Sequence, residues 1–241
     1  MRIGSDFKKV TFVVEGWQLL EPNALIGDTL LAMICFGMAV TIYQWRTHSL
    51  YFKYWIGFFV IFGCSLLLGG IGHTMFNYWG VRGKYFSWFS SLISLYLLER
   101  AVISKDRNLR RKRWLTSLAK FKVGMLIAAE VMVVSIFDLS IDSHLGLLVP
   151  SIATATSLLI YCGFVALQLS RNVHPSFRHL SWALMSMLPT AVIQGFKISI
   201  HPLFDRNDLS HICLMLMLIF FWKSIRGYYI FLTSTDESKI G

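Results

Sequence analysis

The chain is short of charged residues and of cysteine, and each shortage excludes a class of protein. Only 15% of its 241 residues are charged, whereas about a quarter of the residues are charged in a soluble domain. The four cysteines are widely separated and show no CxxC spacing, which excludes a disulfide-rich scaffold and a zinc knuckle. The sequence also has no internal repeat and no low-complexity linker, so we expect a single domain covering residues 1–241.

Hydrophobic residues, in contrast, make up 55% of the chain, and the mean hydropathy is +0.58. They gather in runs of about twenty residues, the length at which a helix spans a bilayer. Seven such runs cover residues 24–45, 51–76, 85–104, 117–137, 145–169, 181–200 and 209–233. The pattern predicts an all-α polytopic membrane protein, a bundle of seven transmembrane helices.

Lysine and arginine are unevenly divided between the predicted loops. The densest basic run, KDRNLRRKR at 105–113, separates the third and fourth spans. Short loops rich in Lys and Arg stay cytoplasmic, so we expect the N-terminus outside and the C-terminus in the cytoplasm. Short loops and few glycosylation sites favour a bacterial inner (cytoplasmic) membrane.

The same run, with the net charge of +10, raises the question of nucleic acid. Between two spans it is better explained by anionic lipid headgroups. We therefore expect membrane lipids as partners and no nucleic acid, while the oligomeric state stays open.

Ionisable side chains inside a span are costly and are candidates for function. In an antiparallel bundle, several polar residues of different spans fall at one outer depth. They are Asp28, His73, Glu130, Gln194, Lys197 and the polar residues of the segment 201–211.

The segment NDLSH at 207–211 has the spacing of a metal site. Asn207 and Asp208 precede His211 by four and three residues, which places all three on one helical surface. Imidazole and carboxylate are ligands that suit zinc, and His73 from another span can complete the set. Two alternatives stay open: Asn207 or Asp208 caps the last helix, and the two histidines form a buried hydrogen-bonded pair.

Glu21, Asn23 and Asp28 surround the start of the first span. Their oxygen atoms can bind a hard cation such as calcium, as a second metal site, or they can cap and anchor the helix. Asp28 lies inside the span, where we expect it to pair with Lys197 or to orient one of the histidines.

Three motifs, EPN...D at 21–28, GG...H at 69–73 and ND..H at 207–211, resemble those of an uncharacterised family of seven-helix membrane proteins. They are also distantly similar to the superfamily of membrane hydrolases that includes the alkaline ceramidases. That resemblance implies zinc at His73 and His211 and calcium at Glu21 and Asn23. The sequence departs from the superfamily pattern where Gly69 replaces a serine and Asn207 a histidine, and the span 85–104 contains no aspartate.

These observations lead to a metal-dependent hydrolase of a lipid amide or ester bond. The metal would lower the pKa of a bound water to make it the nucleophile. Glu130 or Asp28 would act as general base, and Lys197 or Gln194 would stabilise the oxyanion. The alternative is a non-catalytic seven-helix receptor, carrier or membrane-complex component, in which the same residues form a structural polar network.

Overall fold

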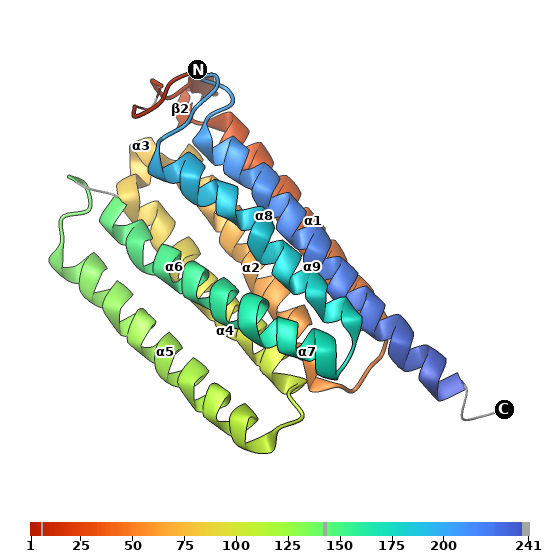
Figure 1. Cartoon of the computed structure of the whole chain (residues 1–241). Helices are drawn as coiled ribbons and strands as arrows, with labels where there is room; N and C mark the ends of the chain where they lie inside the picture. Colours follow the sequence, from red (N-terminus) through yellow and green to blue (C-terminus); the bar gives the residue numbers. More distant parts are fainter. Residues whose placement is uncertain (6, 142–143, 238–241) are drawn as a thin grey trace.

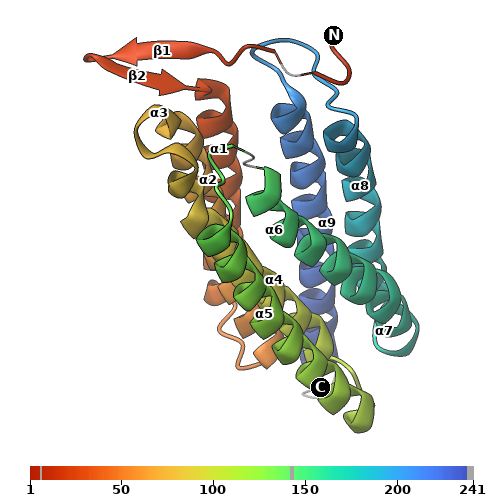
Figure 2. The ribbon, with the colours of Figure 1, turned by 90° about the vertical axis from the view of Figure 1, so that its left-hand side faces the viewer.

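The computed structural model describes residues 1–5, 7–141 and 144–237, so the last four residues of the predicted domain 1–241 lie outside it. The described chain forms a bundle of long helices with a β-hairpin at one end (Figures 1 and 2). The helices are α1 (Pro22–Gln44), α2 (Leu50–Thr74), α3 (Phe76–Trp79), η1 (Gly80–Lys84), α4 (Tyr85–Ser104), α5 (Leu109–Ile136), α6 (His144–Ser157), η2 (Leu158–Val165), α7 (Ala166–Asn172), η3 (Pro175–Phe177), α8 (Arg178–Gly195) and α9 (Arg206–Glu237).

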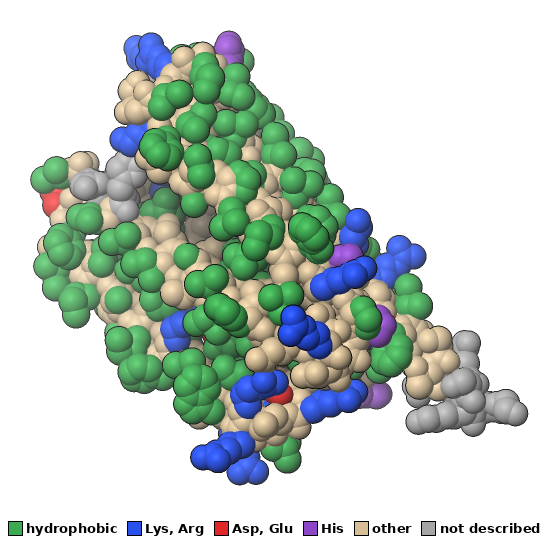
Figure 3. Space-filling model, viewed as in Figure 1, with side chains coloured by type: hydrophobic (Ala, Val, Ile, Leu, Met, Phe, Trp, Pro, Cys, Tyr) green, Lys and Arg blue, Asp and Glu red, His purple; other side chains and the backbone are tan. Residues whose placement is uncertain are grey.

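Five helical segments are long and apolar enough to cross a membrane. They are Pro22–Gln44, Leu50–Thr74, Phe76–Ser104, Leu145–Asn172 and Arg206–Thr235. On the face shown in Figure 3, hydrophobic side chains cover most of the bundle, and lysine and arginine gather mainly at its lower end. The chain is therefore an all-helical integral membrane protein.

The helix boundaries differ from the predicted spans where the ends are polar. The span predicted at 85–104 coincides with α4, but α5 begins at Leu109 instead of 117. Asn108 caps α5, because its side-chain oxygen accepts the N–H of Arg111 at 3.0 Å. The span predicted at 145–169 consists of α6, the π-helix η2 and α7.

The hairpin precedes α1 and was not predicted. Strands β1 (Thr11–Val14) and β2 (Trp17–Leu20) pair antiparallel, with Val14 opposite Trp17. Glu15 and Gly16 both have positive φ, 48° and 84°, as in the two-residue turns that suit the twist of a hairpin. We call the end of the bundle that carries this hairpin the hairpin end, and the opposite end, with the run 105–113, the basic end.

The core at the basic end consists of aromatic rings. Trp55 on α2 lies within 5.6 Å, between ring centroids, of Phe58, Phe59 and Phe221. Tyr51 and Phe177 are completely buried in the same cluster. Ring packing joins α2, η3 and α9 and leaves little free space between them.

Helices α6 and α8 lie against different neighbours. α6 packs on α4 and α5, whereas α8 packs along α9. Both contain an internal proline, Pro150 and Pro189, which removes one helical hydrogen bond from each. The two helices converge at η2 and α7, and their ribbons diverge towards the hairpin end (Figure 2). Side chains of both helices line a cavity there.

Candidate functional site

A cavity of about 720 Å³ occupies this space. Its wall consists mainly of apolar side chains from α2, α4, α6, η2 and α8, including Leu147, Leu158, Leu184 and Met187. Figure 3 shows a hollow over the gap between α6 and α8 of Figure 1. Polar side chains also line the cavity, and they include Asp28, Ser65, His73, Lys84, Ser87, Gln194, Asn207, Ser210 and His211.

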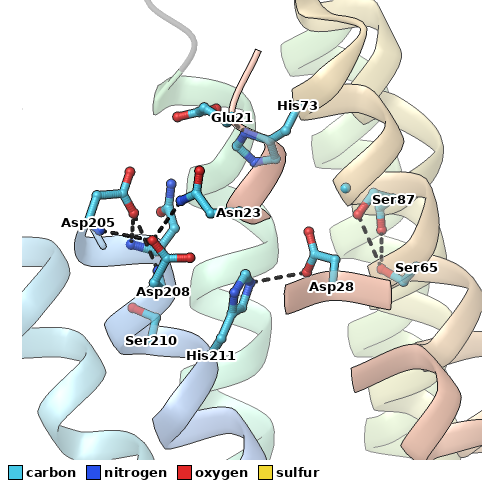
Figure 4. Close-up of polar contacts among 12 residues, drawn as sticks. Glu21, Asn23, Asp28, Ser65, His73, Ser87, Asp205, Asp208, Ser210 and His211 are labelled. Atoms are coloured by element: carbon cyan, nitrogen blue, oxygen red, sulfur yellow. Dashed lines mark hydrogen bonds and ion pairs between the residues drawn. The ribbon is translucent and has the colours of Figure 1, made fainter. Parts of the chain in front are cut away.

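Asp28 and His211 form a pair across α1 and α9. Nε2 of His211 lies 3.1 Å from Oδ1 of Asp28 (Figure 4). The opposite side of the ring faces Gly27, where an added Cβ would lie only 2.6 Å from Nδ1 of His211. Glycine at position 27 is therefore what allows the imidazole to reach Asp28, and of the two expected partners of Asp28, Lys197 or a histidine, the contact is with a histidine.

His73 is held by Glu21 at the hairpin end. Nδ1 of His73 lies 2.8 Å from Oε2 of Glu21, and Nζ of Lys9 lies 3.0 Å from the same oxygen. Burial opposes ionisation of Glu21, but the hydrogen bonds and charges of His73 and Lys9 outweigh it and lower the pKa of Glu21 to about 2. Because an ionised carboxylate only accepts, Nδ1 of His73 is the donor in this contact.

Asp208 belongs to a reciprocal cap at the start of α9. Asp205 is the N-cap: its Oδ1 accepts the N–H of Asn207 at 2.7 Å and that of Asp208 at 3.3 Å. In return, Oδ2 of Asp208 accepts the N–H of Asp205 at 2.9 Å, the arrangement of a capping box. The same oxygen accepts from Nδ2 of Asn23 at 2.7 Å. The expectation that Asn207 or Asp208 caps the helix is therefore wrong in its residue, because Asp205 is the N-cap and Asp208 is the third helical residue.

Gln194 links α8 to the same turn of α9. Its Nε2 donates to Oγ of Ser210 at 2.8 Å and lies 3.4 Å from Oδ1 of Asn207. Asn207 thus contacts Gln194 on α8. On α1, His211 contacts Asp28 and Asp208 contacts Asn23. The three side chains expected on one helical surface are directed to different partners.

The glycines of α2 allow close helix packing at this level. A Cβ at Gly70 would lie 3.0 Å from Cβ of Asp28, and one at Gly72 would lie 2.6 Å from the carbonyl oxygen of Gly83. Gly69 lies beside the cavity, and a Cβ there would lie 3.1 Å from Oγ of Ser87. These close approaches place Asp28 and His73 at the cavity wall.

The chain matches a protein family along residues 24–229, a family of unknown function designated DUF6962. The chain belongs to this family. Asp28, His73 and the segment 207–211 lie within the matched residues, whereas Glu21 and Asn23 precede them. No curated protein and no solved structure matches the chain. Membership of DUF6962 therefore brings no established activity, and the similarity to the alkaline ceramidases stays a prediction.

The candidate metal ligands lie in three separate contacts, His73 with Glu21, His211 with Asp28, and Asp208 with Asn23 (Figure 4). Across residues 1–5, 7–141 and 144–237, no three His, Cys, Asp or Glu side chains are grouped so as to hold a metal ion. The described arrangement therefore does not fit a three-ligand zinc site, and zinc and calcium stay predictions from the sequence.

Two residues predicted to act in catalysis lie away from these contacts. Glu130 on α5 is completely buried, and neither of its carboxylate oxygens has a hydrogen-bond partner within the described part of the chain. Lys197 follows the end of α8 with a positive φ of 49°. Neither residue is among those that line the cavity, and Asp28 pairs with His211 and not with Lys197.

Four features of the site were not predicted from the sequence. Lys84 and Thr190 line the cavity, and the buried hydroxyl of Thr190 has no hydrogen-bond partner in the described residues. Oγ of Ser65 donates to the carbonyl oxygen of Ser87 at 2.8 Å, and Lys9 supports Glu21. Only the hairpin that carries Lys9 had a signal, because Glu-Gly separates two short β-prone runs.

Proposed function

We propose that the chain spans the membrane seven times and binds an amphipathic, lipid-like molecule in the cavity between α6 and α8, as a receptor or carrier. The observation that carries the proposal is the cavity itself. Its volume of about 720 Å³ lies within the roughly 300–1,000 Å³ of small-molecule sites. Its mainly apolar wall suits an acyl or isoprenoid chain.

The polar groups at the wall suit a polar head group. His73 offers its second ring nitrogen, and Lys84 and Thr190 offer donors. Asp28, His211, Glu21 and Asp208 are used in contacts between elements. Such pairing supports a structural polar network around a binding site, which is the non-catalytic alternative raised by the sequence.

The proposal includes the two helices that are less apolar. α5 lies beside α4 and α8 beside α9, and both follow the length of the bundle in Figures 1 and 2. Arginine and lysine crowd the start of α5, and α8 begins with Arg178 and His179, so these polar ends lower the mean hydropathy of both helices. We place the hairpin end outside and the C-terminus in the cytoplasm of a bacterial inner membrane, following the basic loops.

The direct test of this proposal is to fill the cavity with a larger side chain. Ala155 on α6 lines the cavity, and Ile152 on the same helix is 49% exposed and is not a lining residue. We expect the purified protein to bind the fluorescent fatty acid cis-parinaric acid saturably. Ala155→Trp should weaken binding about tenfold or more, and Ile152→Trp should leave it unchanged. Uptake that never saturates, or that is equal in both variants, would reject the proposed site.

Metal-dependent hydrolysis of a lipid amide or ester is the second candidate. It is favoured by one observation: His73 and His211 both line the cavity, so one bound lipid can contact both. Its test is the metal content of the detergent-purified protein beside folded His73→Ala and His211→Ala variants. Near-stoichiometric zinc that is lost in both variants would support hydrolysis, and a metal-free protein purified without chelators would reject it.

A further inference from the structure

A second pocket lies at the basic end, far from the polar contacts of the cavity. Its volume is about 240 Å³. It is enclosed by the start of α2, the end of α4 and the start of α5. The lining residues are Ser49, Leu50, Tyr51, Tyr54, Arg100, Ile103, Ser104, Lys105, Lys112 and Thr116. Three of these are cations and none is an acid, so the lining of the pocket is positively charged.

Within the described part of the chain, each of the three cations donates its hydrogen bonds to neutral groups. Nζ of Lys105 donates to Oγ of Ser49 at 3.2 Å, and Nζ of Lys112 donates to the carbonyl oxygen of Ser104 at 2.7 Å. Arg100 donates to the hydroxyl of Tyr96 at 3.0 Å, but its buried Nε has no hydrogen-bond partner among the described residues.

The neighbouring Arg111 shows the contrast. Its guanidinium forms an ion pair with Asp106 and also donates to Gln168. The two carboxylates adjacent in sequence to the lining residues are thus already engaged, Asp106 by Arg111 and Glu99 by Lys122. Burial raises the pKa of Asp106, but Arg111, Asn108 and Lys112 lower it by more. The basic run is therefore divided between a neutralised arginine and two lysines that face a cavity.

The lysines also act on each other. Burial and the charge of Lys112 lower the pKa of Lys105, as expected when a cation loses water and faces a like charge. The start of α2 adds to this field, because the first N–H groups of a helix are unpaired and Ser49 makes no side-chain cap. An anion placed between these groups would relieve the repulsion and accept their hydrogen bonds.

We propose that this pocket binds a phosphate group through Arg100, Lys105 and Lys112. The group belongs either to an anionic lipid, whose head group lies at this depth of the membrane, or to a free phosphate compound in solution. A basic pocket between helices near the membrane surface suits the lipid source. The site stands apart from the amphiphile cavity and does not depend on its function.

The test compares two probes under equal ionic strength. Inorganic phosphate is added to the detergent-purified protein and the unfolding temperature is recorded. Separately, phosphatidylglycerol and phosphatidylcholine compete for retention in native mass spectrometry. The variants are Lys105→Gln and Lys112→Gln. Matched controls are Arg110→Gln and Arg113→Gln, because these two exposed arginines of the same run do not line the pocket.

We expect one probe to raise the unfolding temperature or to remain bound to the wild type and to the controls. Half-saturation should need about tenfold more anion in Lys105→Gln and in Lys112→Gln. Retention of phosphatidylglycerol alone identifies the lipid source, and a response to phosphate alone identifies a soluble one. The absence of any anion effect in the wild type, or an equal loss in the control variants, overturns the proposal. Arg100→Gln provides a third folded variant if one lysine variant aggregates.

Discussion

The hairpin end and the basic end of the bundle hold their helices together by different means. At the basic end, interlocked rings such as Trp55, Phe58 and Phe221 fill the space between helices. At the hairpin end, polar contacts join α1, α2 and α9 while a cavity remains between α6 and α8. Directional polar contacts fix helix positions without filling the volume between them, and so they leave a larger space, about 720 Å³, than the pocket of about 240 Å³ beside the packed rings.

Trp55→Ala is expected to have the largest effect on stability. The ring is completely buried, and its loss leaves a cavity that costs about 3–5 kcal/mol in large-to-small core substitutions. Trp114→Ala is the control, because Trp114 is 63% exposed on α5. Unfolding by a denaturing detergent would show the difference. Similar stabilities of the two variants would mean that the aromatic cluster does not hold the basic end together.

Acid should weaken the hairpin end next most strongly. The pKa of Glu21 is lowered from its ordinary 4.5 to about 2, so its ionised form stabilises the fold above pH 4.5. This stabilisation is lost as the pH falls from about 4.5 towards 2 and amounts to about 3 kcal/mol at most. Stability measured against pH should fall in this window in the wild type and stay flatter in Glu21→Gln. An identical dependence of stability on pH in both proteins would mean that ionised Glu21 does not stabilise the hairpin end.

Gly27→Ala should have a smaller, local effect. Its Cβ would meet the ring of His211 at 2.6 Å, and crowding of this kind costs about 1–3 kcal/mol. Gly37→Ala on the same helix is the matched control, because nothing lies within 4 Å of its Cβ position. We expect the first variant to lower both the unfolding temperature and cis-parinaric acid binding, and the second to lower neither. Normal binding of cis-parinaric acid by Gly27→Ala would mean that the Asp28–His211 contact does not affect ligand binding in the cavity.

Loss of a helix cap should have the smallest effect on stability, and this effect should be similar at both ends of the bundle. Asp205→Ala at the hairpin end and Asn108→Ala at the basic end each remove an N-cap, at a cost of about 1 kcal/mol. The two variants can be compared by thermal unfolding. A much larger cost for Asp205→Ala would show that the contact from Asn23 to Asp208 depends on the cap.

The helical fold could be predicted because it follows from the apolar runs, and five of the seven runs lie in helices long and apolar enough to cross a membrane. Periodicity does not say which faces of different helices meet, so the partner of each polar side chain remained open. Asp28 had two predicted partners, and close packing around Gly27 decides in favour of His211. Asn207 and His211 share one surface of α9 yet contact different helices, because α1 and α8 flank α9 on two sides.

Other features escaped prediction for a different physical reason. Lys84 lies at the edge of an apolar run, where lysine ordinarily anchors a helix in the interface, and only the fold shows that it lines a cavity. The basic run 105–113 likewise gave no sign of which cations meet a carboxylate. Only the structure shows that Lys105 and Lys112 line a pocket, whereas Arg111 pairs with Asp106.

The π-helix η2 has a consequence for how the segment His144–Asn172 tolerates changes in length. A π-helix usually holds one residue more than the α-helical turns it replaces, and η2 lies where α6 and α8 converge below the cavity. Deleting one residue between 160 and 165 would therefore restore regular α-helical winding and leave the orientation of α6 relative to α7 nearly unchanged. Leu147, Pro150 and Thr154 would still face the cavity they line. The same deletion in the regular helix α7 has no excess residue to remove and would rotate the chain on its two sides by about 100°.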